Sequence, residues 1–82
     1  MEKTAAFRTS DIWLAAGVMA TTHATEVDVE HTTGNRRAVF VIAGVADAER
    51  IADEFHAERL QVNAHGLMRA IRRLKRALYD GE

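Results

Sequence analysis

Residues 25–43, TEVDVEHTTGNRRAVFVIA, decide the fold. Their first part alternates polar and apolar side chains, and their last part is rich in β-branched and aromatic residues, as β-strands are. Between these parts, residues 32–35 (TTGN) have the composition of a turn. The stretch therefore predicts an antiparallel β-hairpin over about residues 25–43.

A turn centred on Thr33 and Gly34 would also set the register of this hairpin. One face is then expected to be core-like throughout. Its predicted pairs are Thr25 with Ile42, Val27 with Phe40, and Val29 with Ala38.

The other face of the hairpin is expected to be mixed. Glu30 is predicted to lie opposite Arg37, a favourable cross-strand pair, while Glu26 and Asp28 oppose Val41 and Val39. A two-stranded ribbon is marginal alone. We therefore expect another element or a second subunit to cover Val39 and Val41, and we assign both valines to a dimer interface.

A helix is expected before the hairpin, over about residues 10–22. It begins at a cluster of N-capping residues at positions 9–11 and continues through a run that is apolar on nearly all sides. So small a chain has little else to cover such a helix, which points to a second subunit. Trp13 and Gly17 are assigned to that dimer interface, since a close helix crossing would explain a glycine in mid-helix.

Two helices are expected after the hairpin. One covers about residues 47–59, opened by Asp47, and the other about residues 63–79, capped by Asn63. Apolar side chains recur along the last helix at Leu67, Ile71, Leu74 and Leu78. The prediction is an α+β fold, one domain over residues 1–82, with the order α-β-β-α-α.

Length and composition favour a soluble homodimer. A domain of 82 residues buries only about 60% of its unfolded surface, and the chain has no cysteine for disulfides or thiolate metal sites. Oligomerisation is the remaining way to supplement the core. The first apolar run is too short to cross a membrane, so no membrane association is expected and a cytoplasmic location is the default expectation.

Charge is distributed unevenly along the chain. The formal net charge of −1 argues against an avid general nucleic-acid binder. Residues 26–58 nevertheless contain eight acidic side chains, whereas residues 60–79 contain five basic ones and none acidic. Such asymmetry suits an anionic partner or contact with a second copy of the chain.

The last predicted helix carries what we call the basic ridge, defined as Arg69, Arg72, Arg73 and Arg76. At 3.6 residues per turn these side chains fall within about 100° of one another, opposite the apolar stripe. Guanidinium groups can bind phosphates with two hydrogen bonds each, and Lys75, Arg36 and Arg37 are candidates to join them. The alternative is an ordinary solvated face whose cations complement the helix dipole.

Other chemistry has little support in the sequence. His23, His31, His56 and His65 lack the spacing of metal-ligand pairs. Ser10 is the sole serine and is explained as an N-cap, which leaves no catalytic triad. No glycine-rich phosphate loop is present. We expect no catalytic residue, no metal and no cofactor, and therefore a protein that is not an enzyme.

The order of the motifs also carries a resemblance. The motifs are residues 9–12 (TSDI) opening an alanine-rich helix, residues 35–41 (NRRAVFV), and residues 68–75 (MRAIRRLK) followed by Leu78 and Tyr79. The chain resembles a family of small uncharacterised domains found in bacteria, phages and mobile elements. It departs from that pattern at Thr22 and His23, where a glycine-containing helix end is commoner, and in lacking an aromatic residue at Ile42. The resemblance implies a fold and a genomic context, and no catalytic residue.

Two functions follow as expectations. The first is a homodimeric binding module of phage or mobile-element type that holds nucleic-acid backbone through the basic ridge. The alternative is a protein-binding factor, such as an inhibitor of a host defence complex. The first predicts strong salt dependence, and the second predicts dependence on an apolar anchor.

Overall fold

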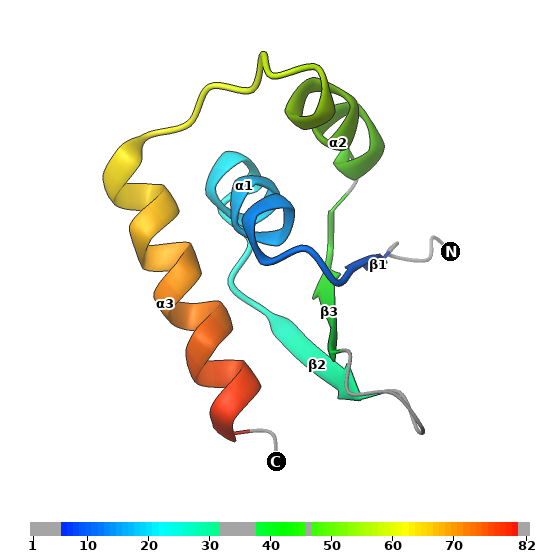
Figure 1. Ribbon diagram of the computed structural model, residues 1–82, viewed down its shortest axis with the longest axis vertical. Coiled ribbons are helices and arrows are strands. Elements are labelled where there is room, and N and C mark those ends of the chain that lie inside the picture. The colour runs from blue at the N-terminus through cyan, green and yellow to red at the C-terminus, as the bar shows by residue number, and fades with distance from the viewer. Residues whose placement is uncertain (1–5, 32–37, 46, 81–82) are drawn as a thin grey trace.

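The computed structural model describes residues 6–31, 38–45 and 47–80. In chain order the elements are β1 (Ala6–Thr9), α1 (Ile12–Thr22), β2 (Val27–His31), β3 (Ala38–Ala43), α2 (Ala48–His56) and α3 (Ala64–Asp80). The strands form one antiparallel sheet in the order β1-β3-β2. Helix α1 lies between α3 and the sheet, with α2 beside it at one end (Figure 1). The predicted α+β class is confirmed.

Strand β1 is absent from the predicted order. It pairs with β3, placing Phe7 opposite Ile42 and Thr9 opposite Phe40. With only four residues and one large apolar side chain, β1 gives little periodic signal before the helix that follows it. Its presence makes β3 the central strand of the sheet.

The predicted hairpin register is wrong by two residues. Val27 lies opposite Ile42 and Val29 opposite Phe40. Because side chains alternate with a period of two, this shift keeps the predicted core face while changing every partner. Glu30 lies opposite Val39 rather than Arg37, and Asp28 opposite Val41. The predicted turn at residues 32–35, together with Arg36 and Arg37, lies outside the described residues.

The outer face of the sheet is bridged by an ion pair. Arg8 of β1 reaches Glu30 of β2 at 2.7 Å across the central strand. Val39 and Val41 share this face and are half-buried. The chain itself therefore partly shields the two valines, for which another element or a second subunit was expected as cover.

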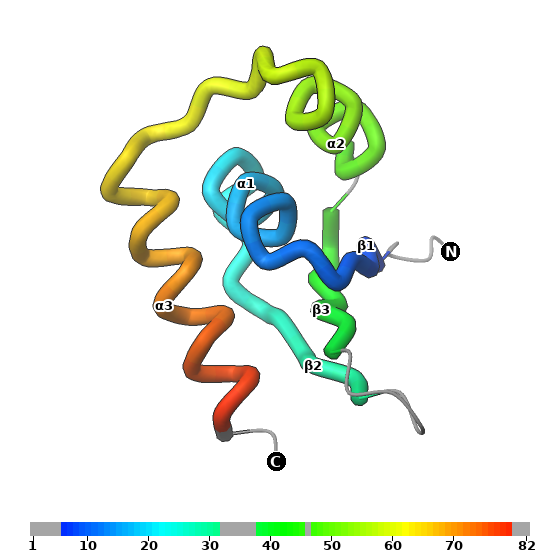
Figure 2. The backbone as a smooth tube through the Cα atoms, in the orientation of Figure 1, coloured from blue at the N-terminus to red at the C-terminus, as the bar shows by residue number. Residues whose placement is uncertain are grey.

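Helix α1 forms the centre of the core. Six consecutive residues, 14–19, are buried. Because six residues make more than one full turn, the helix is buried on all sides there. Helices α2 and α3 and the sheet supply the cover, and the connection from α2 to α3 passes over α1 (Figure 2). The cover expected from a second subunit thus comes largely from the same chain.

Among the described residues, no helix has both the length and the apolarity that a membrane span requires.

Local hydrogen bonds fix where the helices begin. The Asp11 carboxylate accepts from the backbone N–H groups of Trp13 and Leu14, so Asp11 is the N-cap of α1 and the prediction for Ser10 is wrong. The Asn63 side chain accepts from the N–H of Gly66 at 2.9 Å and caps α3 as predicted. Asp47 occupies the N-cap position of α2, but its carboxylate makes no capping hydrogen bond and lies 3.5 Å from Arg50.

Candidate nucleic-acid interface

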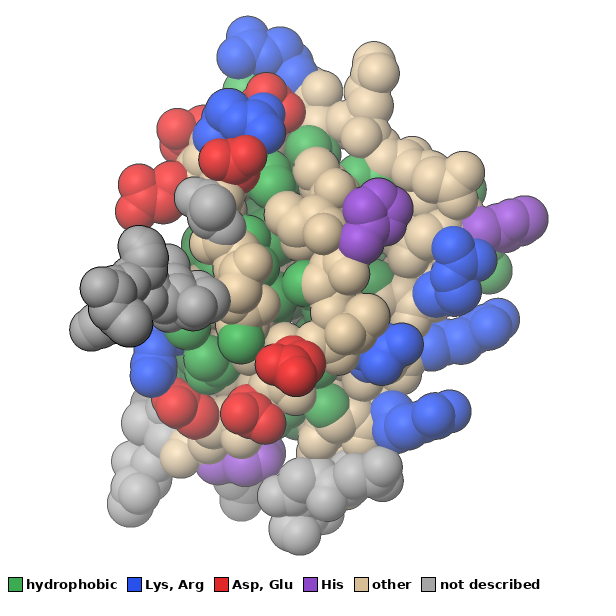
Figure 3. All heavy atoms as spheres, turned by 180° about the vertical axis from the view of Figure 1, so that it is seen from behind, with side chains coloured by type: hydrophobic (Ala, Val, Ile, Leu, Met, Phe, Trp, Pro, Cys, Tyr) green, Lys and Arg blue, Asp and Glu red, His purple; other side chains and the backbone are tan. Residues whose placement is uncertain are grey.

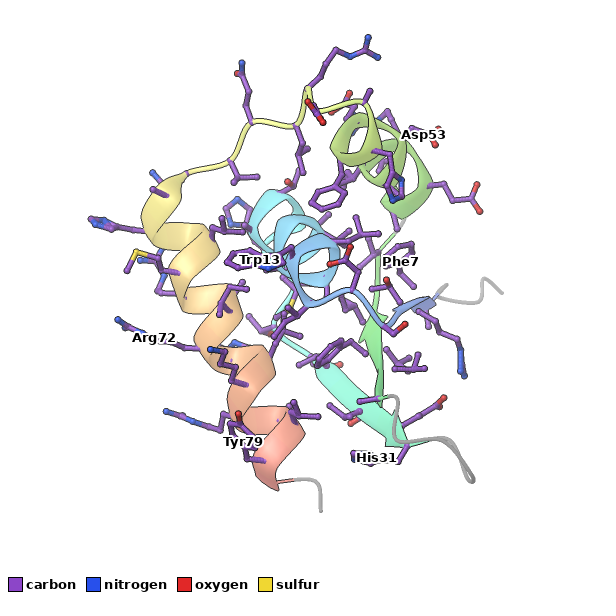
Figure 4. The ribbon with its side chains drawn as sticks, in the orientation of Figure 1. Phe7, Trp13, His31, Asp53, Arg72 and Tyr79 are labelled. Carbon is purple, nitrogen blue, oxygen red and sulfur yellow. The ribbon has the colours of Figure 1, made fainter. Side chains whose placement is uncertain are left out.

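The orientation of α3 follows from its apolar stripe. Ala70 and Leu74 are buried, and Leu67, Ile71 and Leu78 pack partly against the same core. Packing of this stripe against α1 turns the opposite side of α3 outward. All four arginines of the basic ridge are exposed, as is Lys75, and Arg72 points away from α1 and the sheet (Figure 4).

The cations of α3 lack acidic partners within the described residues. The ion pairs found there join Arg8 to Glu30 and Arg50 to Asp47 and Glu54, and none of them involves α3. In α2, by contrast, Arg50 has a carboxylate one turn away in each direction along the chain. Among the described residues, the arginine of α2 is therefore paired with carboxylates, whereas the cations of α3 are not.

Charge is separated over the surface as well as along the sequence. Lysine and arginine side chains gather along the edge formed by α3, while most visible aspartate and glutamate side chains lie toward α2 and the sheet (Figure 3). A separation of this kind creates a directional field that attracts anions to one side of the molecule.

A pocket opens where the end of α1 meets α3. Its volume is about 260 Å³, and we call it the α1–α3 pocket. Arg69 and Arg73 of the basic ridge line one side, and His23 and Thr25 line the other. His23 has a φ of 61° and ends α1 in the left-handed conformation. The remaining lining residues are Met19, Ala20, Ala24, Gly66 and Ala70.

Sequence reasoning missed this grouping of His23 and Thr25 with the two arginines. The two sides of the pocket are more than forty residues apart in the chain, so no motif spacing joins them. The departure from a glycine-containing helix end at His23 was the one available signal, and it did not reveal that His23 lines a pocket together with residues of α3.

The four residues assigned to a dimer interface fall on two separate surfaces. Trp13, which is 57% exposed, and Gly17 line an apolar depression of about 270 Å³ with Phe55, Glu58, Leu60, Val62 and Leu67. Val39 and Val41 lie on the outer face of the sheet, on the side away from the buried core. The structure therefore does not join these four residues into one patch.

Large exposed apolar side chains also accompany the basic ridge. Met68 and Tyr79 on α3 are 50% and 66% exposed. Both follow from the helix geometry, since at 100° per residue they lie beside Arg72 rather than on the apolar stripe. The exposed side of α3 thus combines cations with an aromatic ring, which Figure 4 shows near the C-terminal end of the helix.

The described part of the chain contains no cluster of metal-ligating side chains. No group of three histidine, aspartate or glutamate side chains there is close enough to hold a metal ion. Ser10 is exposed and lies between Thr9, whose hydroxyl accepts from the N–H of Asp11, and the helix N-cap.

Comparisons with known proteins found no matching family model, no matching curated protein and no matching solved structure. Function therefore has to be argued from the geometry and charge of the surface itself.

Proposed function

We propose that the protein is a non-enzymatic module that binds nucleic-acid backbone through α3. The observation that carries this proposal is the set of exposed cations on one helix without an acidic partner among the described residues. Binding of a polyanion would supply the missing negative charge.

The spacing of these cations argues against a merely solubilising face. Arg69 and Arg73 are four residues apart, as are Arg72 and Arg76, and like charges at this spacing destabilise a helix by about 0.2–0.5 kcal/mol per pair. Solvated faces usually intersperse both signs, as α2 does around Arg50. A ridge without acidic partners among the described side chains is therefore better explained by a ligand that carries the opposite charge.

The length of the ridge sets the size of the contact. Seven residues separate Arg69 from Arg76, which corresponds to about 10 Å along the helix at about 1.5 Å per residue. One strand of duplex DNA carries one phosphate per roughly 3.4 Å of axis, so the ridge matches about three phosphates. Contacts of this kind position the backbone and give no base preference.

A matched pair of double variants tests the proposal. Arg72→Gln/Arg73→Gln removes two charges from the ridge, and Arg50→Gln/Arg59→Gln removes two charges from the region of α2. We expect the ridge variant to bind labelled DNA or RNA at least tenfold more weakly than the parent, measured by fluorescence anisotropy at low salt, because phosphate contacts provide most of such affinity. The α2 variant should bind like the parent. Equal loss in both variants, or full affinity in the ridge variant, would contradict the proposal.

The second candidate function is binding of a host protein. The exposed Trp13 beside an apolar depression favours it, since partly buried aromatic side chains are typical anchors at protein interfaces. Under this alternative, Trp13→Ser would abolish capture of the partner and the ridge variant would not. The phage or mobile-element context implied by the sequence resemblance is compatible with both functions and is itself a proposal.

A further inference from the structure

The α1–α3 pocket gathers the groups that recognise a phosphate. Arg69 and Arg73 lie one turn apart on α3 and line the same pocket, so both guanidinium groups are able to turn toward one ligand. His23 and Thr25 add an imidazole and a hydroxyl from the opposite side. No aspartate or glutamate is among the described residues that line it.

An internal role for the two arginines is the competing explanation. The C-terminal end of α1 carries a partial negative charge and no basic residue in its last turn, so cations from α3 would complement it. Within the described residues, however, neither arginine donates a hydrogen bond to a carbonyl of α1, and the side-chain bond found near that end runs from the Thr22 hydroxyl to the carbonyl of Val18. Among the described residues, no hydrogen bond therefore occupies the guanidinium donors of Arg69 and Arg73.

The backbone at His23 adds an observation of another kind. A non-glycine residue in the left-handed conformation costs roughly 1 kcal/mol, and glycine is the usual solution at a helix end. Here a histidine with a φ of 61° takes that place, and this exposed residue is among those that line the pocket.

The size of the pocket restricts the ligand. At about 260 Å³ it is smaller than the roughly 300–1,000 Å³ of pockets that enclose a whole small molecule. The α1–α3 pocket therefore suits a single charged group at the end of a larger ligand. A phosphomonoester has three terminal oxygens and two negative charges, whereas a phosphodiester within a continuous strand has two non-bridging oxygens and one negative charge. Two guanidinium groups therefore match the phosphomonoester better.

We infer that the α1–α3 pocket binds a phosphomonoester, with Arg69 and Arg73 holding its oxygens and His23 and Thr25 enclosing it from the other side. This inference rests on the proposed function in taking the group to be the terminal phosphate of a strand whose next phosphates lie along Arg72 and Arg76. A free nucleotide offers the same chemistry, and the experiment distinguishes the two sources.

The test uses one short single-stranded DNA with a phosphate at its 5′ end, at its 3′ end or at neither, labelled at the end that carries no phosphate. Arg69→Gln/Arg73→Gln is the pocket variant, and Arg72→Gln/Arg76→Gln is the outer variant. Both remove two arginines at the same helical spacing, so charge loss alone affects them alike. Thermal unfolding monitored by circular dichroism verifies that both remain folded.

We expect the parent to bind one of the phosphorylated strands at least tenfold more tightly than the strand without a terminal phosphate. The pocket variant should lose this preference. The outer variant should bind all strands more weakly and keep the preference. A parent that binds every strand equally would overturn the pocket inference and leave the proposed function standing, and loss of the preference in both variants would also overturn it.

A titration with a free nucleoside 5′-monophosphate, followed by NMR of the arginine side chains and of the His23 imidazole, separates the sources. Shifts at Arg69, Arg73 and His23 together with absence of strand binding would support the pocket with a free nucleotide as ligand and would contradict the proposed function. Absence of both kinds of binding would overturn both proposals.

Discussion

His23 and Glu58 are non-glycine residues in the left-handed region, with φ angles of 61° and 62°. Each follows a helix. At Glu58 the conformation closes a hydrogen-bonded helix end, in which Glu58 N–H donates to the Phe55 carbonyl and Arg59 N–H to the Glu54 carbonyl. At His23 it directs the chain from α1 toward β2, and His23 is among the residues that line the α1–α3 pocket.

Gly17 provides the sharpest prediction at the residue scale. A Cβ atom at this position would lie 3.1 Å from Leu60 Cδ2. Gly17→Ala should therefore be nearly neutral, because the helix propensity gain of about 1 kcal/mol is offset by this tight contact. Gly17→Leu should lower the free energy of unfolding by about 2 kcal/mol through overpacking, as measured by urea denaturation.

The control for Gly17 is its neighbour. Leu60→Ala makes room at the same place, so adding it to Gly17→Leu should cost less than the two single changes predict together. Additive effects, or a Gly17→Leu variant as stable as the parent, would mean that Leu60 does not cover Gly17.

Individual residues show where sequence reasoning succeeds. Asn63 caps α3 as predicted because the signal is local, a polar side chain three residues before the N–H that it accepts from. The choice of Asp11 over Ser10 at the start of α1 depends on one backbone conformation, which composition does not specify. A close helix crossing was expected at Gly17, whereas the nearest neighbour in this chain is the side chain of Leu60 from the α2–α3 connection.

At the scale of elements, β1 should be held by its inner side chain rather than by its ion pair. Phe7 packs partly against the core, so Phe7→Ala should cost about 2 kcal/mol, somewhat less than a fully buried phenylalanine. Arg8→Ala should cost about 0.5 kcal/mol, because both partners of the Arg8–Glu30 pair are more than half exposed. Chemical denaturation of both variants gives the comparison. Equal costs would contradict the placement of Phe7 on the core face.

Periodicity in the sequence predicts helices, strands and their buried faces, but it does not predict strand register or very short strands. Alternation identified β2, a run of β-branched and aromatic residues identified β3, and the apolar stripe identified α3, because these patterns extend over whole elements. The register depended on the turn chosen at residues 32–35, and a shift by two residues preserves every face and so leaves no trace in the pattern. Strand β1 was missed because four residues contain too few repeats.

For the whole molecule, the homodimer remains a prediction with a defined surface. Trp13 is more than half exposed beside an apolar depression, whereas Val39 and Val41 are half-buried near the Arg8–Glu30 pair. We therefore expect light scattering at micromolar concentration to give twice the chain mass of 9.1 kDa. Trp13→Ser should yield monomers and Val41→Thr should not. A monomeric parent would contradict the dimer.

The candidate site was predictable only in part at this scale. Helical periodicity is enough to place the basic ridge on one side of α3, and the structure has all four of its arginines exposed. Arg36 and Arg37 lie outside the described residues. The α1–α3 pocket depends on how two helices cross, which no local pattern in either helix encodes.

The salt dependence of nucleic-acid binding tests the central claim most directly. With about three phosphates neutralised by the basic ridge, the affinity of the parent should fall roughly 20- to 40-fold between 50 and 200 mM salt, on the order of the counterion-release slope for single or double strands. In Arg72→Gln/Arg73→Gln this dependence should become markedly shallower. Absence of binding at low salt, or a slope that the ridge variant leaves unchanged, would contradict the assignment of α3 as the nucleic-acid interface.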